Sequence, residues 1–128
     1  MKILAIFCLA LACTTVQAEW VPFAGNAERT DYHDPTMTRR AGDRVRIWVL
    51  TDYKSPQSLP DAKRYLSSVN QFEIDCANGA YRTPFTSIYS GAMRAGTHLG
   101  SANDFQLDWQ PAMPQTRPGH LVKIACDR

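Results

Sequence analysis

The sequence of 128 residues has almost no net charge and only one long hydrophobic run. Its 14 lysines and arginines exceed its 12 acidic residues by two. So small an excess produces neither the basic field that nucleic acid requires nor an acidic tail. Outside the N-terminus, no apolar run approaches the roughly 18 residues that cross a bilayer. We therefore expect no nucleic-acid partner and no transmembrane helix.

The chain also lacks the short motifs of common enzymes. It has no GxSxG nucleophile motif and no CxxC pair, and its glycines at positions 91, 96 and 100 are too widely spaced for a phosphate-binding loop. The three histidines are the obvious general bases: His33, His98 and His120. None of them lies in a catalytic pattern, and the Asp31 and Asp34 positions beside His33 favour a polar strand end over a metal site. We expect a non-enzymatic protein without metal or cofactor.

The N-terminal segment has the layout of a cleaved secretory signal. One charge, Lys2, precedes the apolar run Ile3–Ala12, and small residues end the segment at Ala18. Cleavage after Ala18 divides the chain into a signal peptide, residues 1–18, and a domain of 110 residues, 19–128. Removing Lys2 leaves 13 basic and 12 acidic side chains in that domain. We therefore expect one small exported domain.

Two of the four cysteines lie inside this signal. Cys8 and Cys13 leave with it, so the domain keeps Cys76 and Cys126, which are 50 positions apart. In an oxidising compartment this pair favours one structural disulfide, worth roughly 4 kcal/mol in the chain-entropy model. The residues before Cys13 also resemble, imperfectly, the approach to a lipid-modified cysteine. A lipid anchor at Cys13 is therefore the alternative to cleavage after Ala18.

Short strand-like segments separated by turn residues predict an antiparallel sheet. The expected strands are Glu19–Phe23, Arg29–His33, Arg44–Tyr53, Tyr65–Cys76, Ala80–Tyr89 and Phe105–Trp109. The clearest is Arg44–Tyr53, in which β-branched residues alternate with basic and large ones. Asn78-Gly79 predicts the tight turn of a hairpin.

The segments 54–62 and 90–103 have the composition of loops, and Gly119–Cys126 favours a helix over a strand. The predicted fold class is α+β: a small, mainly antiparallel β-sheet domain with a short C-terminal helix and one disulfide.

Two groups of side chains are candidates for binding. The basic residues are Arg39, Arg40, Arg44, Arg46 and Lys54. Within this group, Arg44, Arg46 and Lys54 are the predicted partner contacts, because their charges attract an acidic partner. Asp43 and Asp52 interrupt the group, so a solvated strand face with local ion pairs is the alternative interpretation.

The aromatic residues are the second group. The tryptophans Trp20, Trp48 and Trp109 suit either a binding surface or the core. An alternative hypothesis is a periplasmic small-molecule site lined by Trp48, Tyr81 and Tyr89.

Several motifs follow one another along the domain, at residues 19–21, 32–35, 44–53, 72–76, 81–82, 88–91 and 123–126. The most specific are Trp-Val-Leu-Thr-Asp-Tyr at 48–53 and Glu-Ile-Asp-Cys at 73–76. Taken together, in this order, they resemble the bacterial surface-adhesin protein E family.

The resemblance implies a small antiparallel sheet with a C-terminal helix, in which Cys76 pairs with Cys126. It also implies export to the envelope of a Gram-negative bacterium, either to the periplasm or to the cell surface and outer membrane. Named members bind host matrix proteins such as vitronectin and laminin, so we expect partners of this kind. The ligand and the oligomeric state stay open, a homodimer included, and a periplasmic binding or structural domain is the alternative.

Overall fold

Residues 18–127 are described by a computed structural model, and the predicted signal peptide, with Cys8 and Cys13, lies outside them except for Ala18. The elements follow in the order β1 (Val21–Gly25), β2 (Arg29–His33), the 3₁₀ turn η1 (Pro35–Met37), β3 (Arg39–Ala41), β4 (Arg44–Ser58), β5 (Arg64–Asp75), β6 (Ala80–Tyr89), the 3₁₀ turn η2 (Ala92–Arg94), β7 (His98–Pro111) and α1 (Arg117–Cys126). No helix within residues 18–127 has the length and apolar character needed to span a membrane.

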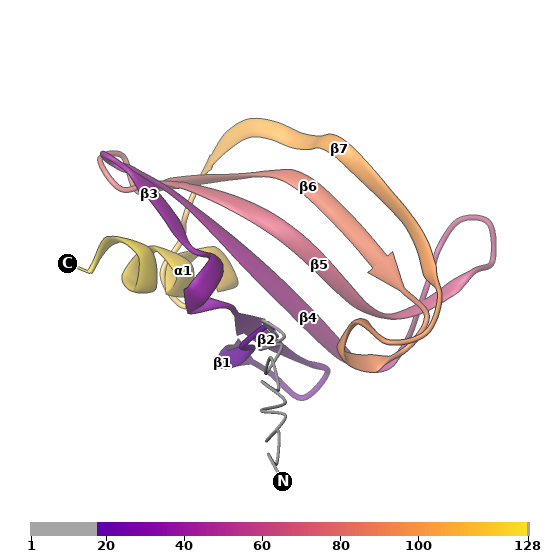
Figure 1. Cartoon of the computed structure of the whole chain (residues 1–128). Helices are drawn as coiled ribbons and strands as arrows, with labels where there is room; N and C mark the ends of the chain where they lie inside the picture. Colours follow the sequence, from indigo (N-terminus) through magenta and orange to yellow (C-terminus); the bar gives the residue numbers. More distant parts are fainter. Residues whose placement is uncertain (1–17, 128) are drawn as a thin grey trace, which may run out of the picture.

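The strands form one twisted antiparallel sheet in the order β1-β2-β4-β5-β6-β7 (Figure 1). The short strand β3 pairs with the beginning of β4, where Arg39 lies opposite Arg46. The helix α1 packs against one face of the sheet. This arrangement confirms the predicted antiparallel sheet with a C-terminal helix.

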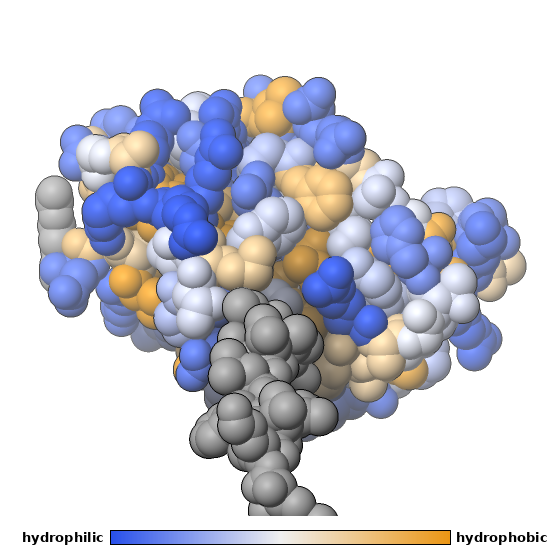
Figure 2. Space-filling view, viewed as in Figure 1, coloured by the Kyte–Doolittle hydropathy of each residue, from blue (hydrophilic) through white to orange (hydrophobic). Residues whose placement is uncertain are grey.

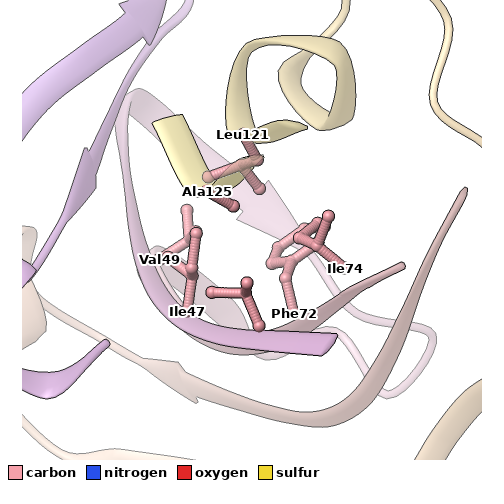
Figure 3. Packing of buried hydrophobic residues seen from close by; sticks show 7 residues of the cluster. Ile47, Val49, Phe72, Ile74, Leu121 and Ala125 are labelled. Carbon is pink, nitrogen blue, oxygen red and sulfur yellow. The ribbon is translucent and has the colours of Figure 1, made fainter. Parts of the chain in front are cut away.

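The core lies between α1 and the central strands, because β4 alternates in burial. Val45, Ile47 and Val49 are fully buried, and the register places Ile47 opposite Phe72 of β5. Leu121 and Ala125, one turn apart on α1, close this cluster from above (Figure 3). Burial of each valine, leucine or isoleucine side chain in this cluster stabilises the fold by roughly 1.5–3 kcal/mol.

Local interactions define both ends of α1. At its start the Thr116 hydroxyl accepts a hydrogen bond from the Gly119 N–H at 3.3 Å, which satisfies one free helix donor. A side chain at position 119 would lie 2.2 Å from the Met113 carbonyl oxygen, so only glycine fits there. At its end Cys126 forms the disulfide with Cys76, directly after β5. The predicted disulfide is confirmed, and the helix begins two residues before the predicted Gly119.

The prediction of a loop from Lys54 to Ala62 was wrong for its first half. β4 continues to Ser58, because Gln57 pairs with Tyr65 after an irregularity in the register. Pro56 lies within that irregularity, where its missing N–H costs no ladder hydrogen bond. Pro56 therefore marks an irregularity within the strand, whereas Pro60 lies in the turn that follows the strand.

The prediction of a loop over Ser90–Asn103 was wrong for its second half. β7 begins at His98 and contains the predicted strand Phe105–Trp109. It pairs only with β6, through three irregularities in the register, and most of its residues are exposed. Alternation of apolar and polar residues arises where one face of a strand is buried. Because β7 is exposed on both faces, its sequence lacks this alternation and did not predict a strand.

Candidate functional site

The face of the sheet opposite α1, called here the open face, carries part of each predicted binding group. Val45, Ile47 and Val49 point toward α1, so Arg44, Arg46 and Trp48 point the other way, because strand side chains alternate. Figure 2 shows hydrophilic residues gathered over the β3 end of the sheet. Arginines and an aromatic hollow share this face.

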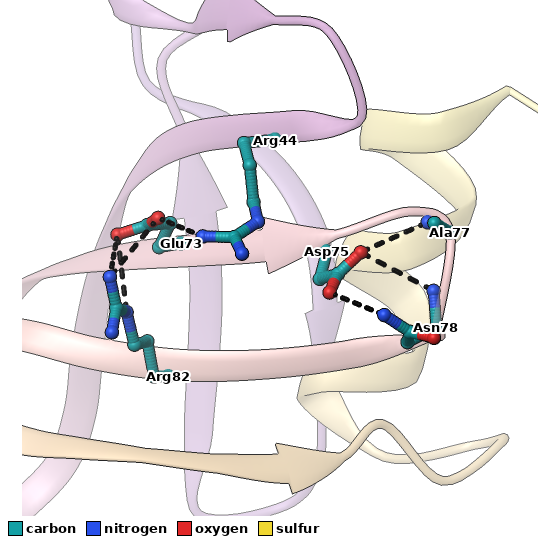
Figure 4. A network of polar contacts seen from close by, with 6 residues as sticks. All are labelled: Arg44, Glu73, Asp75, Ala77, Asn78 and Arg82. Carbon is teal, nitrogen blue, oxygen red and sulfur yellow. Dashed lines mark hydrogen bonds and ion pairs between the residues drawn. The ribbon is translucent and has the colours of Figure 1, made fainter.

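An acidic residue organises the arginines. Glu73 of β5 is only 6% exposed. Its carboxylate accepts from Arg44 Nη1 at 3.2 Å and from Arg82 Nη2 at 3.1 Å, so it lies between the two guanidinium groups (Figure 4). One buried negative charge therefore holds two positive charges in place.

Trp109 of β7 completes this group. The guanidinium carbons of Arg44 and Arg82 lie 4.6 and 4.5 Å from the centre of the Trp109 ring. Both distances are within the range of cation–π attraction. The two arginines are thus fixed by a carboxylate and an aromatic ring together.

Arg39 and Arg46 extend the positive charge to the edge of the sheet. They lie directly opposite each other in the β3–β4 ladder and therefore on the same face. Both are exposed. Arg39 Nη1 donates to the carbonyls of Thr36 and Thr38, whereas the Arg46 side chain forms no ion pair with any residue in 18–127. We call Arg39, Arg44, Arg46 and Arg82 the arginine cluster.

The structure divides the predicted basic group. Arg44 and Arg46 belong to the arginine cluster, but Lys54 is eight residues farther along β4, roughly 26 Å at 3.3 Å per residue. Arg40 is opposite Val45 and faces α1, where its guanidinium donates to the Ala125 carbonyl at the helix end. Sequence reasoning missed Arg82 and Glu73 as site residues, and it named Trp109 only as one of three tryptophans that suit either a binding surface or the core. The signal for Glu73 was a single acidic residue between the apolar Phe72 and Ile74.

The hairpin turn beside the cluster is held by another carboxylate. Asp75 accepts from the N–H groups of Ala77 and Asn78, and from the Asn78 amide at 2.8 Å (Figure 4). The Asn78 side-chain bond chiefly lowers the pKa of Asp75; burial opposes this, while the two N–H groups and the charge of Arg44 add to it. The predicted Asn-Gly turn is confirmed, with Gly79 at φ +60°.

A hollow of about 400 Å³ occupies the other half of the open face. Trp48, Val69, Phe85 and Tyr89 line it, together with Trp20 from the N-terminal end. The rings of Trp48 and Phe85 meet edge to face, with centres 5.6 Å apart.

The rim of this hollow is polar. Arg94 Nε donates to the Tyr89 hydroxyl at 3.3 Å, and the His98 ring centre lies 5.3 Å from that of Tyr89. Burial raises the pKa of Tyr89, but hydrogen bonds with Ser87 and Arg94 and the charge of Arg94 lower it by more. An apolar floor with a basic rim suits a flat ligand or an aromatic side chain.

Tyr81 lies on the opposite face from Trp48 and Tyr89. It is paired with the buried Ile74, and its ring centre is 6.0 Å from that of Phe72. It lines a second, more polar hollow of about 470 Å³ beside the start of α1. The structure therefore brings two of the three predicted pocket residues together and places Tyr81 elsewhere.

The histidines and their acidic neighbours are separated too. Asp31 accepts from the Thr51 hydroxyl at 2.7 Å on the α1 side, whereas Asp34 accepts from Thr36 and Glu19 at the end of β2. His33 packs edge to face on Phe23, with ring centres 5.6 Å apart. Within residues 18–127 no three His, Cys, Asp or Glu side chains form a group that could hold a metal ion.

Comparisons with known proteins agree with this architecture. Residues 20–127 match the family model described as Surface-adhesin protein E. No curated protein sequence matches the chain. Among solved structures, protein E of Haemophilus influenzae is similar with a TM-score of 0.66 and 16% identity, over 89% of this chain and 88% of that one. Its second crystal form gives a TM-score of 0.68 at 16% identity, over 89% and 91% of the two chains. At such identities the structural likeness shows the fold alone.

Proposed function

Because the chain belongs to the surface-adhesin protein E family, we propose that it is an adhesin whose arginine cluster binds host matrix proteins. Membership makes the chain a non-enzymatic adhesin and implies an exported bacterial surface protein. The proposed part is the partner: extracellular matrix proteins such as vitronectin and laminin, which the family resemblance suggests. The proposed contact is an acidic segment of that partner.

One observation carries this proposal: the guanidinium groups of exposed Arg44 and half-buried Arg82 lie over the Trp109 ring on the open face of the sheet. Arginine and tryptophan are enriched among the residues that dominate binding energy. Glu73 already holds Arg44 and Arg82, so less side-chain freedom is lost when a partner binds. Arg46 is exposed and has no ion-pair partner within residues 18–127, and its charge remains available to steer an acidic surface.

Binding to immobilised vitronectin and laminin tests the proposal. The full-length chain is exported from a Gram-negative host, purified and titrated by surface plasmon resonance. We expect saturable binding that weakens as salt rises, and about tenfold lower affinity for Arg46→Ala, as for a contact residue. The matched control is Arg64→Ala, because Arg64 is exposed at the far end of β5. It should bind as the unaltered protein does.

Two results would reject the proposal. The first is no saturable binding of either matrix protein at high micromolar concentration. The second is equal loss of affinity in the Arg46 and Arg64 variants, which would indicate bulk charge rather than a site. Lys54→Ala, tested alongside, shows whether the contact reaches the distant end of β4.

Surface display and processing are proposed as well. An adhesin must be reachable from outside, so protease added to intact cells should degrade the full-length protein. We propose cleavage after Ala18 rather than a lipid anchor at Cys13. A protein that is protected in intact cells but degraded after the outer membrane is opened would instead be periplasmic.

The aromatic hollow supports a second candidate function, binding of a small molecule in the periplasm. Trp48, Phe85 and Tyr89 give it an apolar floor, and its volume of about 400 Å³ lies at the small end of the usual range for ligand sites. Quenching of tryptophan fluorescence by a panel of small aromatic compounds tests it. Because Trp20 and Trp48 both line the hollow, a response that persists in the double variant Trp20→Leu/Trp48→Leu would count against the hollow as the site.

A further inference from the structure

Asp34 is a fully buried carboxylate with no cationic partner among the described residues. It follows β2 and begins η1. Its Oδ1 accepts from the Thr36 N–H at 2.9 Å and from the Thr36 hydroxyl at 2.6 Å. Its Oδ2 accepts from the backbone N–H of Glu19 at 3.1 Å. All three donors are neutral groups.

Asp34 is nevertheless ionised at neutral pH. Burial raises its pKa, but the bonds from Thr36 and Glu19 and the adjacent His33 together hold the pKa below its ordinary value. Burial also lowers the pKa of His33, an effect that Asp34 only partly offsets, so His33 is neutral at pH 7. The hydrogen bonds and His33 therefore more than offset the cost of burying this charge, although none of the three hydrogen-bond donors is positively charged.

The β1–β2 register brings Glu19 to this carboxylate. Val21 is paired with His33, so the chain that precedes β1 runs alongside Asp34. The backbone N–H of Glu19 thereby donates to Oδ2 of Asp34 at 3.1 Å. The predicted cleavage after Ala18 would free this same nitrogen.

We propose that cleavage between Ala18 and Glu19 converts the Glu19 nitrogen into an α-ammonium that forms an ion pair with Asp34. Water hydrolyses the peptide bond: the C–N bond breaks, and Ala18 leaves as a carboxylate. The nitrogen gains protons to become a positively charged amine. An ionised donor makes a hydrogen bond roughly twice as strong as a neutral one. Processing therefore supplies the charge that the Asp34 site lacks.

The ion pair also acts on the aromatic hollow of the open face. Ala18 and Trp20 both line it, one on each side of Glu19 in the chain. With Glu19 held by Asp34, Trp20 stays against the hollow beside Met37 and Trp48. The departure of Ala18 removes one lining residue and widens the entrance. Maturation and the shape of this site are linked.

The test compares two exported proteins that differ by one residue. The first is the unaltered full-length chain, whose processed N-terminus is identified by intact-mass spectrometry; we expect Glu19. The second carries one extra alanine between Ala18 and Glu19, so that after processing the Glu19 nitrogen remains an amide. We expect the unfolding equilibrium constant to be about tenfold smaller for the first protein, equivalent to one pKa unit. In an Asp34→Asn background this difference should vanish.

A direct readout is the titration of the α-ammonium by NMR. Its pKa should lie above the roughly 7.7–8.0 of a free N-terminus, whereas the N-terminal amine of the inserted variant should titrate normally. The proposal fails if the processed chain begins at Cys13 or elsewhere, if the amine titrates normally, or if the insertion leaves stability unchanged. If the Asp34→Asn variant fails to fold, the stability of the insertion variant and the NMR titration still test the proposal. None of these outcomes depends on adhesion.

Discussion

Asp31 shows how single buried polar residues connect the elements of this fold. It is 1% exposed, yet it accepts from the Thr51 hydroxyl of β4 at 2.7 Å and lies 3.4 Å from both Arg29 Nε and Arg117 Nη1. Arg117 belongs to α1, and its guanidinium carbon lies 5.4 Å from the Phe72 ring centre. One carboxylate thus ties β2, β4 and α1 together, and these contacts offset part of the cost of burying its charge.

His33 gives the domain a pH-dependent stability. Burial lowers its pKa, so the folded state takes up its proton at a lower pH than the unfolded chain. Between the unfolded value of about 6.5 and the folded value, the unfolded chain binds more protons, and stability is lost as the pH falls. Asp34 and Asp75, whose pKa values are also lowered, add a further loss below about pH 3.9.

We therefore expect urea midpoints to fall between pH 7 and pH 5, and His33→Gln to flatten this decline. The control is His98→Gln, because His98 is exposed; its profile should follow that of the unaltered protein. A decline of the same size in the His33 variant would show that another group is responsible.

Individual residues were the hardest level to predict from the sequence. The alternation in Arg44–Tyr53 correctly separated buried Val45 and Ile47 from exposed Arg46. It did not indicate that Glu73, in the facing strand, would be 6% exposed between two arginines, because this depends on the register of three strands. Trp109 is 27 residues from Arg82 in the sequence, so only the folded sheet brings them into contact.

At the level of elements, a few buried side chains pack α1 against the sheet. Leu121 is fully buried against β4 and β5, whereas Ile124 on the same helix is 39% exposed. Leu121→Ala should destabilise the domain by about 2–5 kcal/mol, since it removes buried contacts and leaves a cavity. Ile124→Ala, the matched control, should change stability by no more than about 0.5 kcal/mol.

Urea unfolding measures both effects, with the slope of the transition unchanged. Equal effects of the two substitutions would mean that α1 is not packed on the sheet in solution.

Element predictions succeeded where one face of a strand is buried. Strands β2 and β6 have the predicted limits, because their turns are marked by Asp34-Pro35 and Asn78-Gly79. The predictions failed at β7 and at the end of β4, where strands are exposed on both sides or interrupted by a bulge. These segments are strands because they pair with a neighbouring strand, and not because their own sequence alternates between apolar and polar residues.

For the whole molecule, the disulfide closes a loop that contains β6, β7 and α1. Cys76 and Cys126 are separated by 50 residues, and in the chain-entropy model a loop of this size contributes about 4 kcal/mol. That is a large part of the 5–15 kcal/mol typical of a domain. The double variant Cys76→Ala/Cys126→Ala should lose stability by about this amount.

Chemical denaturation measures the loss, and the unaltered protein under reducing conditions provides a comparison without substitutions. If both the double variant and the reduced protein unfold at the midpoint of the oxidised protein, the disulfide contributes no stability.

The overall fold was more predictable than the site. The short strand-like segments between turn residues, the one cysteine pair and the order of the motifs were sufficient to predict the antiparallel sheet, the helix and the family. Distance along β4 separates Lys54 from the arginine cluster, whereas the face of the sheet that each residue occupies separates Tyr81 from Trp48 and the aromatic hollow. A single bulge is enough to change such a grouping.

The two outer strands of the sheet have one more consequence, for solubility. β7 breaks its register three times and includes Asp104 at φ +54°, while β1 has five residues, a proline and a bulge after Pro22. Regular edges invite a second chain to add a strand, which leads to aggregation. On these two edges the irregular spacing of the free N–H and C=O groups does not match the hydrogen-bonding groups of a straight strand. These two edges are therefore poor templates on which a second copy of the chain could add a strand.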